Sequence, residues 1–223
     1  MKKILFFLIM VMLVFFSVGC SKTDLISSSI NSVVDPEFVN VKYNNILVFS
    51  SISDIGWRKK FETSVSNELN NAGVNSYNSI DLLPPTKEYD QEDLNKVIDK
   101  YNIEGVLILN VTNADIIKDY YTTPKQGHTS KSGSGYIIGN NIYTNESETY
   151  YETGGQTYEL NKPTMNVEAK IFDTRYNAWS WICQVSTYGP AITNFQDLID
   201  KSAIDITDKL IEDKKIKEIS KDK

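Results

Sequence analysis

The chain of 223 residues contains one histidine and two cysteines, and this scarcity excludes several classes of function. With His128 as its single imidazole, the chain has almost nothing to build a nitrogen-rich zinc site from. The sequence has no Gly-x-Ser-x-Gly, His-Glu-x-x-His, Cys-x-x-Cys or Walker-type phosphate-binding motif. We therefore expect no metal, no cofactor and no enzymatic activity.

An excess of positive charge is also missing. Lys and Arg number 23 against 29 Asp and Glu, which gives a formal net charge of −6. A chain this acidic lacks the electrostatic footprint of a nucleic-acid-binding protein, so we expect no nucleic-acid partner. The acidic residues Glu146, Glu148 and Glu152 lack the Asp-rich, Gly-containing spacing of a calcium loop, and the exposed edge of a strand explains them more simply.

Long apolar runs are absent except at the start, where Ile4 to Phe16 follows Lys2 and Lys3. This run is too short for a comfortable transmembrane helix, which needs about 20 residues. Its length suits the apolar region of a secretory signal peptide, about 7–15 residues. We therefore predict that the chain is exported. An uncleaved N-terminal anchor is the alternative.

The residues that end this run, Ser17-Val18-Gly19-Cys20, resemble the lipobox of bacterial lipoproteins, with Ser17 where leucine is usual. The resemblance implies that residues 1–19 are a signal peptide and that Cys20 becomes the N-terminus and carries lipid, palmitate included. The protein would then be attached to its membrane partner through acylated Cys20. If sorting follows the enterobacterial rule, Ser21 implies the outer membrane, with the protein facing the periplasm.

Acylation of Cys20 would leave Cys183 without a partner in the chain, so we expect Cys183 to be buried. A Cys-His pair with His128 is the enzymatic alternative.

Apolar periodicity downstream predicts an α/β (α+β) domain over residues 43–214, with a flexible tether at 20–42 and a frayed tail at 215–223. Apolar runs at 45–50 and 105–111 predict buried strands. Trp57, Phe61, Val65 and Leu69 recur every four residues and predict one apolar helix face. The strand and helix order predicts a mixed sheet with helices packed on it, in two layers or in a three-layer-like arrangement.

Two further elements complete this domain. Residues 165–171 and 179–185 alternate apolar and polar side chains around a turn at 173–177, which predicts a β-hairpin that buries Trp179 and Trp181. A last helix is predicted from about Asn194 to Glu212.

Residues 116–163 interrupt the domain with a stretch rich in tyrosine, threonine, serine and glycine. A structureless loop of this length inside a compact domain is improbable, so we predict one or two protruding β-hairpins around a flexible tip at 124–135. Tyrosines suit protein interfaces and sugar stacking. The candidate partner-binding residues are Tyr136, Tyr143, Tyr150, Tyr151 and Tyr158; the alternative is that they fill the face of an ordinary hairpin.

Several short sequence segments, in their order along the chain, resemble those of a known group of proteins. They are Ala72-Gly73, Leu82-Leu-Pro-Pro85, the strand Gly105-Val-Leu-Ile-Leu109, and Phe172-Asp-Thr followed by Ala178-Trp-Ser-Trp181. The chain from 44 to 212 looks like a group of uncharacterised bacterial envelope lipoproteins. Their α/β domain is similar to the curli-secretion lipoprotein and to the N-terminal domain of the Tol propeller protein. The resemblance implies a non-enzymatic envelope role and assigns no functional residue.

We therefore expect a lipid-anchored accessory or binding module that recognises an envelope protein complex or cell-wall glycan. The alternative is a subunit of an oligomeric outer-membrane secretion channel similar to the curli exporter. Such a channel needs spanning strands of about 9–11 residues with one apolar face, and only residues 135–144 come near that pattern. The oligomeric state is left open.

Overall fold

The structure is a computed structural model that describes residues 25–138 and 141–217, and within this range the side chains of 130–147 are not described. The predicted signal peptide and Cys20 lie outside the described residues. The chain divides into two compact units, one of residues 1–117 and 162–223 and one of residues 118–161. We call them unit 1 and unit 2 and describe each by itself.

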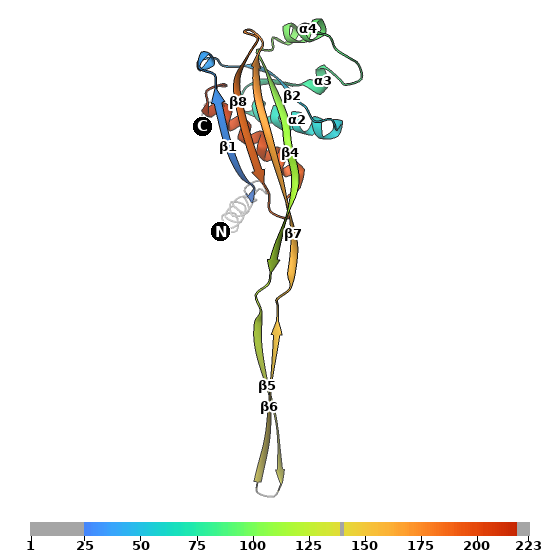
Figure 1. Cartoon of the computed structure of the whole chain (residues 1–223), viewed down its shortest axis with the longest axis vertical. Helices are drawn as coiled ribbons and strands as arrows, with labels where there is room; N and C mark the ends of the chain where they lie inside the picture. The colour runs from blue at the N-terminus through green and yellow to red at the C-terminus, as the bar shows by residue number, and fades with distance from the viewer. Residues whose placement is uncertain (1–24, 139–140, 218–223) are drawn as a thin grey trace, which may run out of the picture. The chain divides into compact units, whose positions relative to one another are not determined.

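Unit 1 is built on a mixed six-stranded sheet in the order β1-β8-β7-β4-β2-β3 (Figure 1). The strands are β1 (Ser27–Val34), β2 (Asn45–Ser50), β3 (Asn75–Asn78), β4 (Gly105–Thr122), β7 (Thr157–Asp173) and β8 (Ala178–Tyr188). Strands β3, β2 and β4 are parallel, whereas β1, β8 and β7 are antiparallel. The predicted mixed α/β sheet is confirmed.

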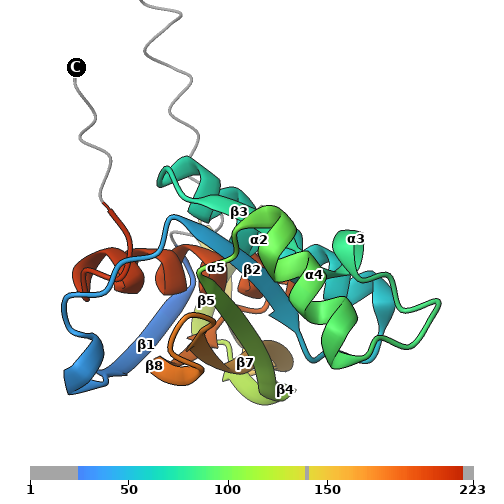
Figure 2. The same cartoon turned by 90° about the horizontal axis from the view of Figure 1, so that it is seen from above.

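Helices cover the two faces of this sheet unequally. The long helices α2 (Ile55–Asn71) and α5 (Phe195–Glu212) pack against each other, and Figure 2 shows α5 running across β1, β8 and β7. The shorter α4 (Gln91–Tyr101) lies over the opposite face, where Leu47, Phe49 and Ile108 line a groove beneath it. The fold therefore has three layers at β2 and β4. Two short helical turns, η2 (Pro36–Phe38) and α3 (Ser79–Leu82), complete unit 1.

The core lies between the sheet and the pair α2 and α5. Phe61, Val65 and Leu69 are fully buried in α2, as their spacing predicts, and Leu198 and Leu210 of α5 are fully buried beside them. Trp57, the fourth member of the predicted helix face, is 37% exposed. Its burial was wrongly predicted, because Trp57 sits in the first turn of α2, where the helix has passed the edge of the core.

The predicted hairpin of β7 and β8 is confirmed, but the facing of Trp179 is not. The pairing register shifts between Ile171 and Phe172, so that Ile171 pairs with Trp181 and Phe172 pairs with Trp179. The extra residue, Ser180, is a β-bulge, and a bulge reverses the alternation of the strand beyond it. Trp181 is therefore buried whereas Trp179 is 46% exposed.

Both predicted flexible ends contain ordered structure. Within the predicted tether 20–42, β1 pairs with β8 from Ser27 to Val34 and η2 follows. In the predicted frayed tail, the Lys215 side chain is fully buried and its ammonium group donates a hydrogen bond to the Phe38 carbonyl. The Lys215 carbonyl also accepts from the Tyr43 amide. Both predictions are wrong for these residues, because each segment completes its backbone hydrogen bonds with distant parts of the chain.

The loop that leaves β2 is fixed by a buried carboxylate. Glu62 of α2 is fully buried, and its Oε1 accepts from the Ser50 amide at 3.0 Å and from the Arg58 Nε at 2.9 Å. The same oxygen accepts from the Ser79 hydroxyl, and Oε2 accepts from the Ile80 amide. Glu62 thus ties the end of β2 to α2 and α3, and it sets where residues 51–54 run.

Unit 2 is a two-stranded ribbon. Strand β5 (Gln126–Ile138) pairs with β6 (Asn141–Thr153) in an unbroken antiparallel register from Gln126↔Thr153 to Ile138↔Asn141. The ends of β4 and β7 supply the other residues of the unit. The predicted insertion and its hairpin are confirmed, but the predicted flexible tip at 124–135 is wrong because most of it is strand β5. The turn lies at 139–140, outside the described residues.

Candidate functional site

Unit 2 contains all five candidate tyrosines. Tyr136 and Tyr143 are directly paired across β5 and β6, and their side chains are outside the described set. Tyr150 and Tyr151 are neighbours in β6, and Tyr158 lies in β7. The exposed fractions of Tyr150, Tyr151 and Tyr158 are 62%, 49% and 48%. These three tyrosines are exposed, Tyr150 and Tyr151 on the β5–β6 hairpin and Tyr158 on β7, and their role in binding a partner stays a prediction.

The tyrosines do not share one surface, because successive residues of a strand face opposite sides. The register places Tyr151 on one face of the ribbon and Tyr150 on the other. Tyr151 stacks on His128, its partner in the register, with ring centroids 5.5 Å apart. Tyr150 lies over Gly127, where an added Cβ would stand 2.2 Å from the tyrosine hydroxyl. Contacts with residues of the neighbouring strand therefore hold the Tyr151 and Tyr150 rings in place.

The same register separates charge by face. Among the ribbon residues whose side chains are described, both charged residues of the two strands, Glu148 and Glu152, lie on the face that carries Tyr150. The described residues of the opposite face are Gln126, His128, Thr149, Tyr151 and Thr153. Within this described part of the ribbon, one face is therefore acidic and the other carries hydroxyl, amide and aromatic groups without an acidic residue. The sequence hides this separation, because it appears only when the two strands are paired.

The surroundings of the candidate cysteine nucleophile argue against a reactive thiol. Cys183 is fully buried in β8, as predicted, and burial raises its pKa to about 12. Such a thiol carries almost no thiolate at neutral pH. His128 belongs to unit 2, where its Nε2 is 3.1 Å from the Thr153 hydroxyl. The structure therefore does not bring the two residues together within either unit.

The described residues can also be compared with the requirements of a metal site and of a membrane-spanning helix. Over 25–138 and 141–217, no cluster of three or more His, Cys, Asp or Glu side chains could hold a metal ion. None of the helices in these same ranges combines the length and apolar character that crossing a membrane requires. Cys20, the predicted lipidation site, lies outside these ranges.

Comparison with known proteins gives a weak likeness of fold. No protein-family description and no curated protein matches the sequence. Among solved structures, the PelC dodecamer from Paraburkholderia phytofirmans gives a TM-score of 0.46 at 11% identity, over 86% of this chain and all of that chain. A variant of the same dodecamer gives 0.45 at 11% identity, over 85% of this chain and 99% of that one.

A PDZ domain protein from Parabacteroides distasonis gives a TM-score of 0.32 at 10% identity, over 80% of this chain and 35% of that one. Likenesses of this size do not carry residue roles or ligands to this chain, so its function has to be inferred from its own residues.

Proposed function

We propose that this protein is a non-enzymatic accessory module of the bacterial cell envelope, and that the ribbon of unit 2 binds an envelope partner. The observation that carries the proposal is the exposure of unit 2. None of its described side chains, in 118–129 and 148–161, is buried, and Tyr120, Tyr121, Tyr150, Tyr151 and Tyr158 are about half exposed or more. This surface contributes almost nothing to a core.

A two-stranded ribbon is marginally stable by itself in water. Each of β5 and β6 has one strand neighbour in the described sheet, so each leaves one edge of unpaired N–H and C=O groups, which readily accept another strand. The ion pairs along the ribbon, Lys118–Glu159 at 2.9 Å and Lys125–Glu152 at 3.4 Å, are exposed and stabilise it by no more than ~1 kcal/mol each. Binding of a partner to the faces or edges would supply the missing stability.

The location in the envelope rests on the sequence. The run Ile4–Phe16 and the sequence Ser17-Val-Gly-Cys20 support export, acylation of Cys20 and retention at a membrane, in our proposal the outer membrane on its periplasmic side. Lipid chains contribute about 0.8 kcal/mol per buried methylene, and several chains anchor a protein stably. Replacement of Cys20 by alanine should leave a precursor that takes up no labelled palmitate. Normal lipid labelling of that variant would contradict the anchoring.

The partner proposal is tested by removing the ribbon along the unit boundary. A variant with residues 118–161 replaced by a short Gly/Ser link should keep near-native circular dichroism and melting, because unit 1 retains its whole core. In cross-linking pull-downs from intact cells, the wild-type protein should capture a partner that this variant does not. The control is Trp179→Ala, which alters an equally exposed aromatic residue of unit 1 and should retain the partner. A folded deletion variant that still captures the partner would overturn the proposal.

A second function, a subunit of an oligomeric channel, is favoured by one specific observation. The sequence of β5 carries Lys131 and no acidic residue, whereas β6 carries three glutamates and no basic residue. Pairing β5 of one copy with β6 of the next would join unlike charges, and such head-to-tail contacts generate rings. Both strands have 13 residues, enough to span a bilayer. In its described part, the face without an acidic residue carries hydroxyl, amide and aromatic groups rather than being apolar, which is why the accessory module is our first proposal. The native mass in detergent separates the two, because a channel requires a ring of several copies.

A further inference from the structure

A cleft in unit 1 lies at the carboxyl end of β2, where the connections between parallel strands reverse their direction across the sheet. The chain leaves β2 through α2 on one face to reach β3, and it returns through α4 on the other face to reach β4 on the opposite side of β2. In α/β sheets, ligands bind at the carboxyl ends of the strands at such a switch point. A cleft of about 520 Å³ occupies this place, within the usual range of ligand pockets, ~300–1,000 Å³.

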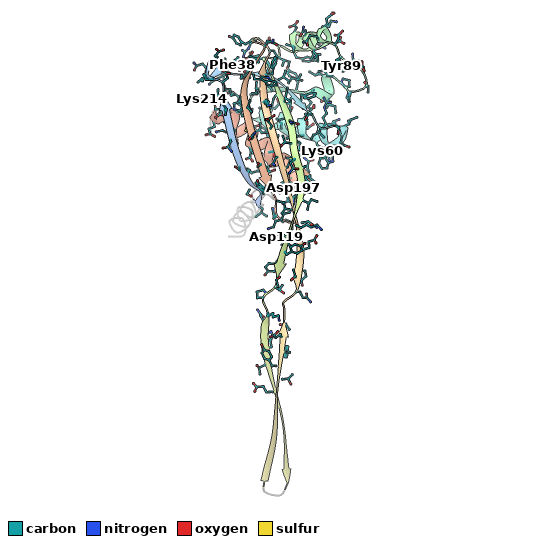
Figure 3. All side chains as sticks on the ribbon, in the orientation of Figure 1. Phe38, Lys60, Tyr89, Asp119, Asp197 and Lys214 are labelled. Carbon is teal, nitrogen blue, oxygen red and sulfur yellow. The ribbon has the colours of Figure 1, made fainter. Side chains whose placement is uncertain are left out.

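Most of the cleft wall is apolar and includes two aromatic rings. Trp57 in the first turn of α2 and Phe195 in the first turn of α5 line it, together with Met165 of β7. The Lys60 ammonium nitrogen lies 4.2 Å from the centroid of the Trp57 ring (Lys60 is labelled in Figure 3). A cation over one face of the indole orients the ring, and the rest of the exposed ring surface is available to a ligand.

The polar part of the wall is made of hydroxyl and amide groups. Ser51 and Ser53, which follow the carboxyl end of β2, and Asn110 within β4 line the cleft. The Ser51 hydroxyl donates to Asn110 Oδ1 at 2.9 Å, which orients the amide. Within the described residues the side-chain nitrogen of Asn110 and the Ser53 hydroxyl have no hydrogen-bond partner. These groups can donate to hydroxyl or carbonyl oxygens of a ligand.

Among the residues that the structure describes, no charged side chain lines the cleft. The helix ends beside it also do not favour an anion. Asp54 caps α2 and accepts from the Trp57 amide at 2.8 Å. Asp197 in the first turn of α5 (Figure 3) accepts from the Asn194 amide at 3.0 Å. These carboxylates already offset the positive ends of the two helix dipoles, so an anionic ligand would meet negative charge. The cleft therefore suits an uncharged ligand.

We propose that this cleft binds a neutral saccharide, with an apolar sugar face against Trp57 and sugar hydroxyls bonded to Asn110, Ser51 and Ser53. An acyl chain or an apolar peptide side chain would leave these polar groups without partners, which is costly. Such ligands fit better beneath α4, where a groove of about 510 Å³ is lined mainly by apolar residues. The saccharide site belongs to unit 1 and does not depend on the ribbon.

The test uses the full-length protein in detergent, titrated with maltose, cellobiose and N,N′-diacetylchitobiose and followed by tryptophan fluorescence and saturation-transfer NMR. We expect at least one sugar to bind at millimolar concentration or below. Trp57→Ala should weaken binding at least tenfold, while Trp57→Phe keeps part of it and guards against misfolding. Trp179→Ala is the matched control, and the ribbon deletion should bind sugar as the wild type does.

Three results would overturn the proposal. They are no binding of any neutral sugar at tens of millimolar, unchanged binding by folded Trp57→Ala, and a preference for a fatty acid or a glucuronide over the neutral sugars. Because the ribbon deletion serves as a separate control, failure of sugar binding leaves the ribbon's role to its own experiment.

Discussion

Unit 1 buries several of its aromatic residues in a core, whereas every tyrosine of unit 2 whose side chain is described is about half exposed or more. Tyr43, Phe61 and Trp181 of unit 1 are at most 1% exposed, and a single core cluster joins them to the sheet and the helices. In unit 2, Tyr150 and Tyr151 remain about half exposed or more, and Tyr150 has a glycine rather than a core beneath it. Aromatic content alone therefore does not locate a core. Stability resides in unit 1, and the surface of unit 2 is available for binding.

Thiol labelling gives the largest expected difference between the two units. In a chain that begins at Ser21, native Cys183 should react only through unfolding, at least ~10³-fold more slowly than an exposed thiol. The matched variant carries Thr129→Cys in β5 with Cys183→Ala, and it should label at once. Both should react fully in denaturant. Rapid native labelling of Cys183 would reopen the possibility of a nucleophile.

Truncation of a core aromatic should have the next largest effect. Phe61→Ala removes a fully buried ring and should lower the free energy of unfolding by about 3–5 kcal/mol through lost burial and a cavity. Tyr151→Ala in the ribbon should change it by less than ~0.5 kcal/mol. Urea unfolding of both variants measures the difference. Equal losses of unfolding free energy in the two variants would mean that Tyr151 of the ribbon is also packed in a core.

Asp173 offers a test of pH dependence within unit 1. Burial alone raises its pKa, but hydrogen bonds from the Arg175 side chain and from the Arg175 and Tyr176 amides outweigh burial and lower it below 3.8. The ionised form therefore stabilises the fold fully above about pH 4, and this contribution is lost as the pH falls through the lowered pKa.

Asp173→Asn should accordingly cost about 1.5–3 kcal/mol at pH 7, the size of hydrogen bonds to a charged group. The difference from the wild type should shrink as the pH falls below 4. Glu152→Gln in the ribbon, whose side chain is 50% exposed, is the control and should change stability little at either pH. A pH-independent effect of Asp173→Asn would show that the carboxylate charge does not matter.

The smallest contrast compares the same substitution in two tyrosines. The Tyr43 hydroxyl donates to Ser180 Oγ at 2.6 Å in the core, and burial raises the pKa of this phenol. Tyr43→Phe should cost about 1 kcal/mol, the net value of one hydrogen bond, whereas Tyr150→Phe should be neutral within ~0.5 kcal/mol. Chemical denaturation of the pair decides this, and an equal cost at both positions would contradict the comparison.

Local sequence patterns predict the parts of the fold that depend on neighbours within one element. The four-residue spacing of Phe61, Val65 and Leu69 and the alternation from Met165 to Ile171 identify buried faces correctly. Helix α5 spans Phe195–Glu212, close to the predicted range, with Asn194 as its N-cap. These signals work because a helix or a strand has a fixed period.

Features that depend on pairing between distant segments are invisible to such patterns. Strand β1 is polar at most positions and forms because Ser28 pairs with Thr187, far along the chain. Strand β5 reads as a loop because glycine and serine are poor strand formers, and it is completed by β6. The bulge that turns Trp179 outward requires two strands to exist.

The features of the candidate sites also divide into those that the sequence alone shows and those that depend on the folded structure. Composition points to the tyrosine-rich insertion, since the tyrosine content is a property of the sequence alone. The separation of charge across the ribbon and the exposure of Trp57 follow from register and from the position of a helix end, so the sequence assigns neither.

The position of β1 limits how far unit 1 could stand from a membrane. Strand β1 begins at Ser27, so an acylated Cys20 would be separated from the sheet by only a few residues rather than by the whole predicted tether. A fully extended chain covers at most ~3.3–3.6 Å per residue, which gives roughly 25 Å of reach. A lipid-anchored unit 1 would thus remain beside the bilayer, and its partners would have to come to the membrane surface.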